Sequence, residues 1–436
     1  MNPAMLAPSV RIQRRTGGQR RWADRARESA ESLRLHSRIR DEALARAALE
    51  PRLARLGDAL LRSPYHARTL RRAGFSPRDL RSLDDIRHFP LLDRETLRRR
   101  WAELPALDPA DRDLELVAVQ SSGSTGRPVT LLKDPYDCVH MWAVLAFWTG
   151  WLGVTLPPRP RVVLLCSLSG GIEYSVRLPL VDDGALHRIS LVRPRALERL
   201  LRARPAVLFA DPDGLHWLES RDGLPRPRIV LSSAQYLAPE QRSRAAAALH
   251  APVVNYYAST DTGPIAWECL LSHGRFHTLV PDVWVESVAG ELVVTRLRPS
   301  VLPLLRYRTG DRGEISPDAC PCGYHGWSIT RFTGRRQCTF LTPDGREADA
   351  WKLAWLFKHY PLHSFRLTQR GAEEFELQLV PERGIVDVGD LRDRLETALG
   401  RLGWARASVA PAVVAAIPCT GEKPDPFRRT WRALPA

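Results

Sequence analysis

The chain has 436 residues, of which 44% are hydrophobic, 26% charged and 8% aromatic. This composition is typical of a globular protein of two or three domains, and it excludes a fibrous repeat, wholesale disorder and a disulfide-stapled miniprotein. The formal net charge is +15, yet residues 1–100 hold 24 arginines and no lysine against 12 acidic side chains, so the remaining chain carries only +3. Because this charge is local and no helix-turn-helix, finger or aromatic-basic motif accompanies it, nucleic acid is the least favoured partner.

No apolar run reaches the roughly 18 residues that cross a bilayer. The N-terminus places Arg11, Arg14 and Arg15 where a signal peptide has its apolar core. We therefore expect no membrane span and a cytoplasmic location. The seven cysteines are accordingly expected to be thiols or metal ligands rather than disulfides.

Leucines at three- and four-residue spacing predict a helix after Pro51 that ends near Ser63-Pro64, with arginines on its solvated face. From about residue 160 to 260, short β-branched runs alternate with helical patterns, which indicates α/β layering around a largely parallel sheet. The predicted strands are 162–166, 206–210, 229–231 and 253–257, and the predicted helices are 195–204 and 239–250.

A further strand is expected at 291–295, and beyond about residue 334 the pattern restarts on a smaller scale. Residues 375–380 alternate like a half-buried strand, and Leu391, Leu395 and Leu399 indicate a helix. We predict a compact α+β unit of roughly a hundred residues here. The domain boundary is expected near Gly334.

The first candidate site is a stretch rich in hydroxyls and glycine, Ser121, Ser122, Gly123, Ser124, Thr125 and Gly126. Glycine lacks the Cβ that blocks close approach, so backbone N–H groups and hydroxyls can surround a polyphosphate. No Gly-Lys-Ser/Thr closes the stretch, so it is not a Walker loop. On composition alone, a plain loop is an equally good interpretation.

Two further stretches carry acidic side chains near expected strand ends. Thr260 and Asp261 follow the predicted strand 253–257, and a hydroxyl beside a carboxylate there is suited to a phosphate and Mg²⁺. Asp311 ends the segment Tyr307-Arg308-Thr309-Gly310-Asp311, where it can accept both hydroxyls of a ribose. Taken singly, each stretch is better explained as a turn.

A fourth constellation consists of Cys269, His277, Cys320 and Cys322. Its spacing can close a tetrahedral site of three sulfurs and one nitrogen, which is typical of structural zinc. The spacing is looser than a double Cys-x-x-Cys, and buried thiols remain the alternative.

Together and in this order, seven segments resemble the adenylate-forming enzymes, in particular the branch of phenylacetate-CoA ligases and their capsular-polysaccharide-locus relatives. The segments are 63–92, 121–128, 231–234, 257–263, 307–311, 334–335 and 417–423. The resemblance covers nearly the whole chain and implies an α/β protein with a large N-terminal domain of layered sheets and helices and a small, mobile α+β C-terminal domain. The implied divisions are a basic helical region 1–105, an ATP- and acid-binding core 106–333 and the small domain 334–436.

The resemblance also implies a two-step reaction. A carboxylate attacks the α-phosphate of ATP, which gives an acyl-adenylate and pyrophosphate, and a thiol then displaces AMP. ATP and Mg²⁺ are the implied cofactors, and coenzyme A or the phosphopantetheine of an acyl-carrier protein is the implied acceptor. The implied substrate is an aryl or small hydrophobic carboxylic acid, and the expected assembly is a monomer or homodimer.

Site residues follow from the same resemblance. The stretch 121–126 would hold the β- and γ-phosphates, Thr260 the α-phosphate and Asp261 the Mg²⁺. Asp311 would take the ribose hydroxyls with Arg335 beside it, and the residues that border the adenine would be Ser233, Ala234 and Tyr257. Some members of the branch carry the same Cys/His arrangement, which favours Zn²⁺ at Cys269, His277, Cys320 and Cys322.

Lys423 matches the mobile C-terminal lysine of the adenylation step. The chain has four lysines, and none but Lys423 follows Lys358. A compact ammonium group suits the bridging of a carboxylate and an α-phosphate better than the rigid fork of arginine. We therefore expect Lys423 to be catalytic rather than a solvated surface lysine.

The chain departs from the family pattern at several positions. Asp261 stands where Glu is usual, Gln235 where Glu is common, and Gln337 and Cys338 where an Asp pair usually marks the hinge. These departures concentrate in parts that serve the second half-reaction, so adenylation is better supported than thioester formation. The alternatives are transfer to a carrier protein or an amine, and a nucleotide-binding relative that has lost turnover.

The acid pocket is less well defined by the sequence. Trp142, Trp148, Trp151 and Tyr174 follow the predicted phosphate-binding stretch and are candidates to line an aryl pocket. Aromatic residues at helical spacing are more often core, so packing remains the alternative.

Overall fold

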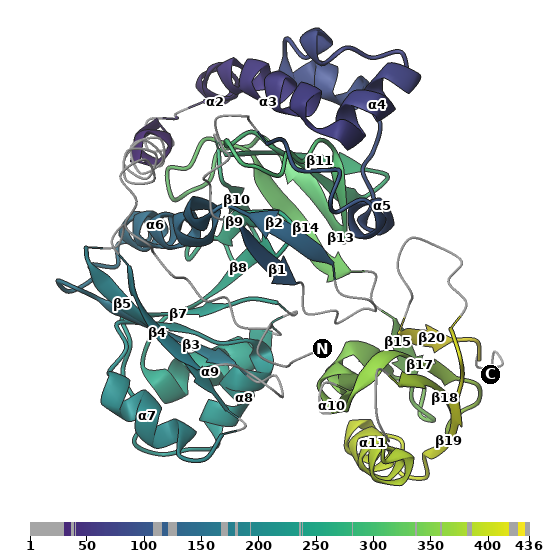
Figure 1. The fold of residues 1–436 in the computed structure, drawn as a ribbon. Coiled ribbons are helices and arrows are strands. Elements are labelled where there is room, and N and C mark those ends of the chain that lie inside the picture. The colour runs from purple at the N-terminus through teal and green to yellow at the C-terminus, as the bar shows by residue number, and fades with distance from the viewer. Residues whose placement is uncertain are drawn as a thin grey trace. The chain divides into compact units, whose positions relative to one another are not determined.

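A computed structural model describes residues 30–35, 39, 41–107, 116–120, 129–166, 173–178, 182–191, 193–234, 237, 239–280, 282–335, 338–357, 360–381, 386–417 and 426–431. The chain divides into two compact units, the first within residues 1–121 and 130–334 and the second within residues 122–129 and 335–436. Each unit has its own hydrophobic core and is described by itself (Figure 1). None of the described helices has the length and apolar character that spanning a bilayer requires.

Helices open the first unit and lie against the antiparallel part of its sheet (Figure 1). They are α2 (Glu42–Leu49), α3 (Pro51–Arg62), α4 (Pro64–Arg72) and the short α5 (Arg94–Arg99). The predicted helix after Pro51 is confirmed, because Leu53, Leu56 and Leu60 of α3 are buried in one cluster with residues of the sheet. It ends at Ser63, whose side chain accepts a backbone N–H from the first turn of α4.

A twelve-stranded mixed sheet forms the centre of the first unit, in the order β11-β12-β13-β14-β10-β9-β8-β7-β6-β3-β5-β4. The strands β5, β3, β6, β7 and β8 are parallel neighbours, whereas β4 and β9 pair antiparallel with β5 and β8. The strands are β3 (Arg161–Cys166), β4 (Tyr174–Leu178), β5 (Gly184–Ser190), β6 (Val207–Phe209), β7 (Ile229–Ser232), β8 (Val253–Ser259), β9 (Gly263–Glu268), β10 (Phe276–Thr278), β11 (Val283–Val288), β12 (Glu291–Arg296), β13 (Tyr307–Ser316) and β14 (Ser328–Arg335).

The parallel part of the sheet is covered on both faces, which is why its strands are nearly continuous apolar runs. The helices on one face are α7 (Ala196–Ala203), α8 (Pro212–Glu219) and α9 (Pro239–Leu249), drawn in teal in Figure 1. Val163 packs with these helices, while the adjacent Val162 packs in the cluster of the opposite face. The predicted strands and helices of this region are confirmed with small shifts at their ends, and the α/β fold class is confirmed with them.

The opposite face is covered by α6 (Pro135–Trp151), which the sequence did not predict as an element. Trp148 of α6 is fully buried and stacks on Trp267 of β9 and His277 of β10, with ring centroids 6.2 and 6.1 Å away. Trp148 is therefore a core residue, in agreement with the packing alternative. Because α6 is apolar on nearly all sides, its sequence lacks the amphipathic pattern from which a helix is predicted.

The second unit is a four-stranded sheet in the order β19-β18-β17-β20, together with a separate β15–β16 hairpin and two helices. Its elements are β15 (Thr339–Leu341), β16 (Glu347–Asp349), α10 (Ala354–Phe357), β17 (Leu362–Gln369), β18 (Glu374–Pro381), α11 (Val388–Leu402), β19 (Ser408–Val413) and β20 (Phe427–Arg429). Asp387 caps α11, and Leu391, Leu395 and Leu399 are fully buried in the core of the unit. The strand predicted at 375–380 and the leucine helix are thereby confirmed.

Candidate functional site

Part of the predicted site lies outside the described residues, namely 121–126, Gln235, Gln337 and Lys423. Of Arg335 the structure describes only the backbone, as the last residue of β14. The roles of these residues stay predictions. The flanks of the stretch 121–126 are described: β1 (Val117–Gln120) and β2 (Thr130–Lys133) are antiparallel, and Gln120 pairs with Thr130.

Two residues predicted to contact the nucleotide are brought together by the fold. The hydroxyl of Tyr257, on β8, donates to Oδ2 of Asp311, on β13, over 2.9 Å. The Tyr257 ring also packs on Phe332 of β14, with ring centroids 4.6 Å apart. Tyr257 is buried, so it orients the Asp311 carboxylate, an acceptor of the kind that ribose hydroxyls require.

The other described candidates follow the carboxyl ends of β7 and β8, which are parallel neighbours. Ser233 and Ala234 come directly after β7, and Thr260 comes directly after β8. Ala234 has a φ of 74°, a left-handed conformation that side chains with a Cβ rarely adopt and that clusters at ligand sites. Ser233 and Thr260 are half-buried and lie at the edge where α/β sheets bind ligands.

Asp261 was predicted to bind Mg²⁺, and in the structure its carboxylate contacts an arginine and a tyrosine. Its carboxylate is buried, and Oδ2 accepts hydrogen bonds from Arg94 Nη1 at 2.8 Å and from the Tyr307 hydroxyl at 2.5 Å. Burial and the neighbouring carboxylate raise the pKa of Tyr307 well above its usual value, so the phenol stays a donor. One oxygen of Asp261 is thus committed to a guanidinium and a phenol, and the role of this residue as a Mg²⁺ ligand stays a prediction.

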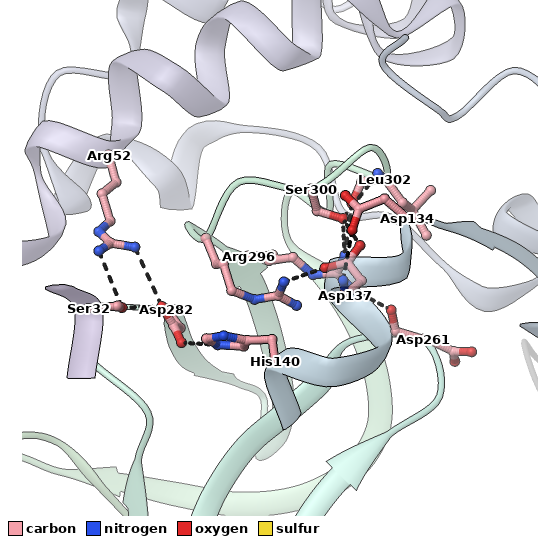
Figure 2. Close-up of polar contacts among 11 residues, drawn as sticks. Ser32, Arg52, Asp134, Asp137, His140, Asp261, Asp282, Arg296, Ser300 and Leu302 are labelled. Atoms are coloured by element: carbon pink, nitrogen blue, oxygen red, sulfur yellow. Dashed lines mark hydrogen bonds and ion pairs between the residues drawn. The ribbon is translucent and has the colours of Figure 1, made fainter. Parts of the chain in front are cut away.

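A buried network connects the start of α6 to the turn that contains Asp261 (Figure 2). Asp137 contacts a guanidinium nitrogen of Arg298 and accepts from the Ser300 hydroxyl at 2.6 Å. Arg296 donates to Ser300 Oγ at 2.8 Å and to the backbone carbonyl of Asp261 at 2.6 Å. Burial opposes ionisation of Asp137, but the charges of Arg298 and Arg296 hold the pKa of this carboxyl well below its usual value.

A second buried carboxylate, Asp282, fixes the middle of α6 (Figure 2). Its Oδ2 lies 2.8 Å from Nε2 of His140, and its Oδ1 accepts from the Ser32 hydroxyl at 2.5 Å and from Arg52 at 3.4 Å. Burial lowers the pKa of His140 although Asp282 opposes this. Since Ser32 contacts Asp282 and not His140, the three do not form a nucleophilic triad.

The Cys/His constellation is assembled as predicted. Cys269 follows β9, His277 lies on β10, and Cys320 and Cys322 lie in the loop between β13 and β14, with all four ligand atoms within 4.8 Å of one another. The Cys269 and Cys320 sulfurs are 3.7 Å apart, which is too far for a disulfide but close to the ~3.8 Å edge of a tetrahedron with Zn–S bonds of about 2.3 Å. His277 Nε2 lies 3.2 Å from the Cys322 sulfur, while its Nδ1 faces the Ser328 hydroxyl at 3.2 Å. The donor set and its orientation fit a closed, structural zinc site.

The functional residues that sequence reasoning missed are the partners of Asp261 and Asp137. Arg94 lies in the N-terminal helical region, 167 residues from Asp261, and Arg298 lies 161 residues from Asp137. No short-range pattern indicates such pairs. Tyr307 was part of a recognised segment, but its bond to Asp261 was not predicted.

Comparison with known proteins gives a consistent result, although no family model matches the chain. Phenylacetate-coenzyme A ligase of Pseudomonas putida is 22% identical over 386 residues, which cover 77% of this chain and 84% of that protein. Phenylacetate-coenzyme A ligase of Escherichia coli K12 is 23% identical over 393 residues, with the same coverage of 77% and 84%.

Among solved structures, 2-hydroxyisobutyryl-CoA ligase in the postadenylation state, in complex with R3-HIB-AMP, has the same fold. The TM-score is 0.57 at 18% identity, with 85% of this chain and 86% of that chain covered. The chain therefore shares the fold of this CoA ligase and is similar in sequence to phenylacetate-CoA ligases. The class predicted from the sequence, an AMP-forming acid–CoA ligase, is confirmed by this similarity.

Proposed function

We propose that this protein activates a carboxylic acid with ATP and transfers the acyl group to the thiol of coenzyme A. In the first step a carboxylate oxygen attacks the α-phosphorus and pyrophosphate leaves. In the second step the thiolate attacks the acyl carbon and AMP leaves. The observation that carries the proposal is the pairing of Tyr257 with Asp311 at 2.9 Å, which joins two predicted nucleotide contacts from distant segments.

The nucleotide is proposed to lie along the carboxyl edge of the parallel strands. Ser233, Ala234 and Tyr257 would border the adenine, Asp311 and Arg335 the ribose, and Thr260 would donate its hydroxyl to the α-phosphate. The stretch 121–126 would surround the β- and γ-phosphates. Donors aimed at the phosphoryl oxygens stabilise the charge that develops when two anions react.

Lys423 is proposed as the catalytic cation of the adenylation step, where its ammonium group would bridge the attacking carboxylate and the α-phosphate. We assign the helical region 1–105 and the core 106–333 to binding of ATP and acid, and the small domain 334–436 to the delivery of this lysine. Mg²⁺ would supply charge neutralisation at the phosphates.

The acid is proposed to be aryl or small and hydrophobic, by analogy with the relatives. Coenzyme A is the favoured acceptor, with a carrier protein or an amine as the alternatives that the departures at Gln235, Gln337 and Cys338 leave open. A monomer or homodimer in the cytoplasm is expected. Zn²⁺ at the Cys/His constellation is proposed to be structural, since four protein ligands leave no open position.

The proposed function is tested by carboxylate-dependent exchange of labelled pyrophosphate into ATP, measured over a panel of aryl and aliphatic acids. We expect exchange with at least one acid, and a loss of at least a hundredfold in Lys423→Ala with ATP binding retained. Lys352→Ala, a lysine removal in the same unit, is the matched control and should leave exchange unchanged. ATP binding without exchange for any acid would instead identify a relative that has lost turnover.

A further inference from the structure

Asp261 receives hydrogen bonds from three separate parts of the first unit. Its Oδ2 accepts from Arg94 of α5 at 2.8 Å and from Tyr307, the first residue of β13, at 2.5 Å. Its backbone carbonyl accepts from Arg296, the last residue of β12, at 2.6 Å. The residue is only 3% exposed, so these bonds are shielded from water and salt.

These contacts connect two segments of the proposed nucleotide site. Asp261 directly follows Thr260, and Tyr307 begins the strand that carries Asp311 four residues later. A bond between Asp261 and Tyr307 therefore sets the position of the α-phosphate turn relative to the ribose acceptor. The bond from Tyr257 to Asp311 makes a second connection nearby, since it joins β8, which ends two residues before Asp261, to β13.

Arg94 supplies the positive charge that faces the buried carboxylate of Asp261. A buried carboxylate needs a compensating charge, and the guanidinium, whose side chain is 13% exposed, supplies it directly. Mg²⁺ usually takes one or two carboxylates together with phosphates and several waters. Oδ1 of Asp261 is buried and receives no hydrogen bond from the described residues, and the cation that pairs with this carboxylate is the guanidinium of Arg94.

We propose that Asp261 is a positioning residue, which holds the Thr260 turn against the strand of Asp311 through Arg94 and Tyr307, and that Mg²⁺ is bound by the phosphates of ATP and not by this carboxylate. The proposal rests on the proposed function, since it concerns the same nucleotide site. It assigns Arg94, from the basic N-terminal region, a role in nucleotide affinity although it touches no nucleotide.

The test is the binding of AMP in the presence of EDTA, measured by titration calorimetry on the full chain. AMP carries the ribose and the α-phosphate but needs no Mg²⁺, so a metal ligand and a positioning residue give opposite results. We expect Asp261→Asn and Arg94→Met each to weaken AMP about tenfold, and the double variant to bind no worse than the weaker single variant. Arg94→Lys, which keeps the charge, should recover part of the affinity.

Arg99→Met is the matched control, because Arg99 lies on the same helix and its contact is an exposed pair with Glu95. It should bind AMP like the wild type. Tyr307→Phe and Arg94→Met leave the Asp261 carboxylate in place, so they test the proposal even if Asp261→Asn fails to fold.

The proposal is overturned if Asp261→Asn binds AMP normally in EDTA but needs at least tenfold more free Mg²⁺ for pyrophosphate exchange. It is also overturned if Arg94→Met and Tyr307→Phe bind AMP like the wild type. A wild type that binds AMP and lacks exchange contradicts the proposed function alone, whereas a wild type that does not bind AMP contradicts both.

Discussion

His66 provides a quantitative test of how the N-terminal helices are held on the sheet. The residue lies in α4, is 4% exposed, and its Nε2 faces the backbone carbonyl of Pro303 at 3.2 Å. Burial lowers the pKa of His66 to about 4 from 6.5, although the hydrogen bond to Pro303 opposes this shift. The imidazole is therefore neutral in the folded protein at neutral pH and donates its Nε2 proton to the carbonyl.

The pH dependence follows from linkage. Between pH 6.5 and 4 the unfolded state binds the proton and the folded state does not, so stability falls as the pH falls through this window. A difference of 2.5 pKa units corresponds to roughly 3 kcal/mol in total, of which about 2.5 kcal/mol is lost by pH 4.5. About one pH unit above 6.5, His66 is neutral in both states and its contribution no longer changes.

The assay is urea unfolding followed by tryptophan fluorescence, at pH 7.5 and pH 4.5, for the wild type and His66→Gln. Glutamine keeps a donor for Pro303 and does not titrate, so the wild type should lose about 2.5 kcal/mol more than the variant between the two pH values. His216→Gln, at a side chain that is 79% exposed, is the control and should behave like the wild type. Equal losses in wild type and His66→Gln would refute the reasoning.

Two further predictions concern the metal site and the buried network. Purified protein should contain about one zinc ion per chain, measured by plasma mass spectrometry. The variant Cys320→Ser should lose most of this zinc, whereas Cys166→Ser, at a buried thiol outside the constellation, should keep it. Equal zinc contents in the two variants would contradict the site. Asp137→Asn should lower the free energy of unfolding by roughly 3 kcal/mol because the buried guanidinium of Arg298 loses the carboxylate it contacts, whereas Asp183→Asn, in an exposed pair with Arg177, should cost less than about 1 kcal/mol. Similar losses in these two variants would show that the network does not carry the stability assigned to it.

The parts of the fold that the sequence predicts are those in which local pattern and tertiary environment agree. The strand 229–231 and the helix 239–250 were predictable because β-branched and helical patterns alternate there and the sheet buries both faces. The helix α6 was not, since a helix that is apolar on nearly all sides has no period. Of the antiparallel strands β9 to β14, only the region of β12 was predicted, although most of these strands pair with their neighbours along the chain.

In the candidate site, too, some features were predicted from the sequence and others were not. The residues Tyr257, Asp311 and the Cys/His constellation were predicted because segment order and ligand spacing are visible along the chain, and the fold brings them together. The contact of Asp261 with Arg94 was not predicted, because a carboxylate in a turn gives no indication that an arginine 167 residues away lies beside it. Long-range ion pairs have no sequence period, so only the structure identifies them.

The arginine-rich composition has a consequence for engineering this chain. Of its 64 lysines and arginines, 60 are arginines. An arginine that only keeps the surface charged can be exchanged for lysine, whereas one that binds several acceptors cannot. Arg296 is of the second kind, because its guanidinium reaches three acceptors in different directions, the Ser300 hydroxyl and the carbonyls of Leu302 and Asp261. A single ammonium nitrogen cannot span these positions. Exchange of Arg296 for lysine therefore removes part of the hydrogen-bonded connection between α6 and the turn that contains Asp261.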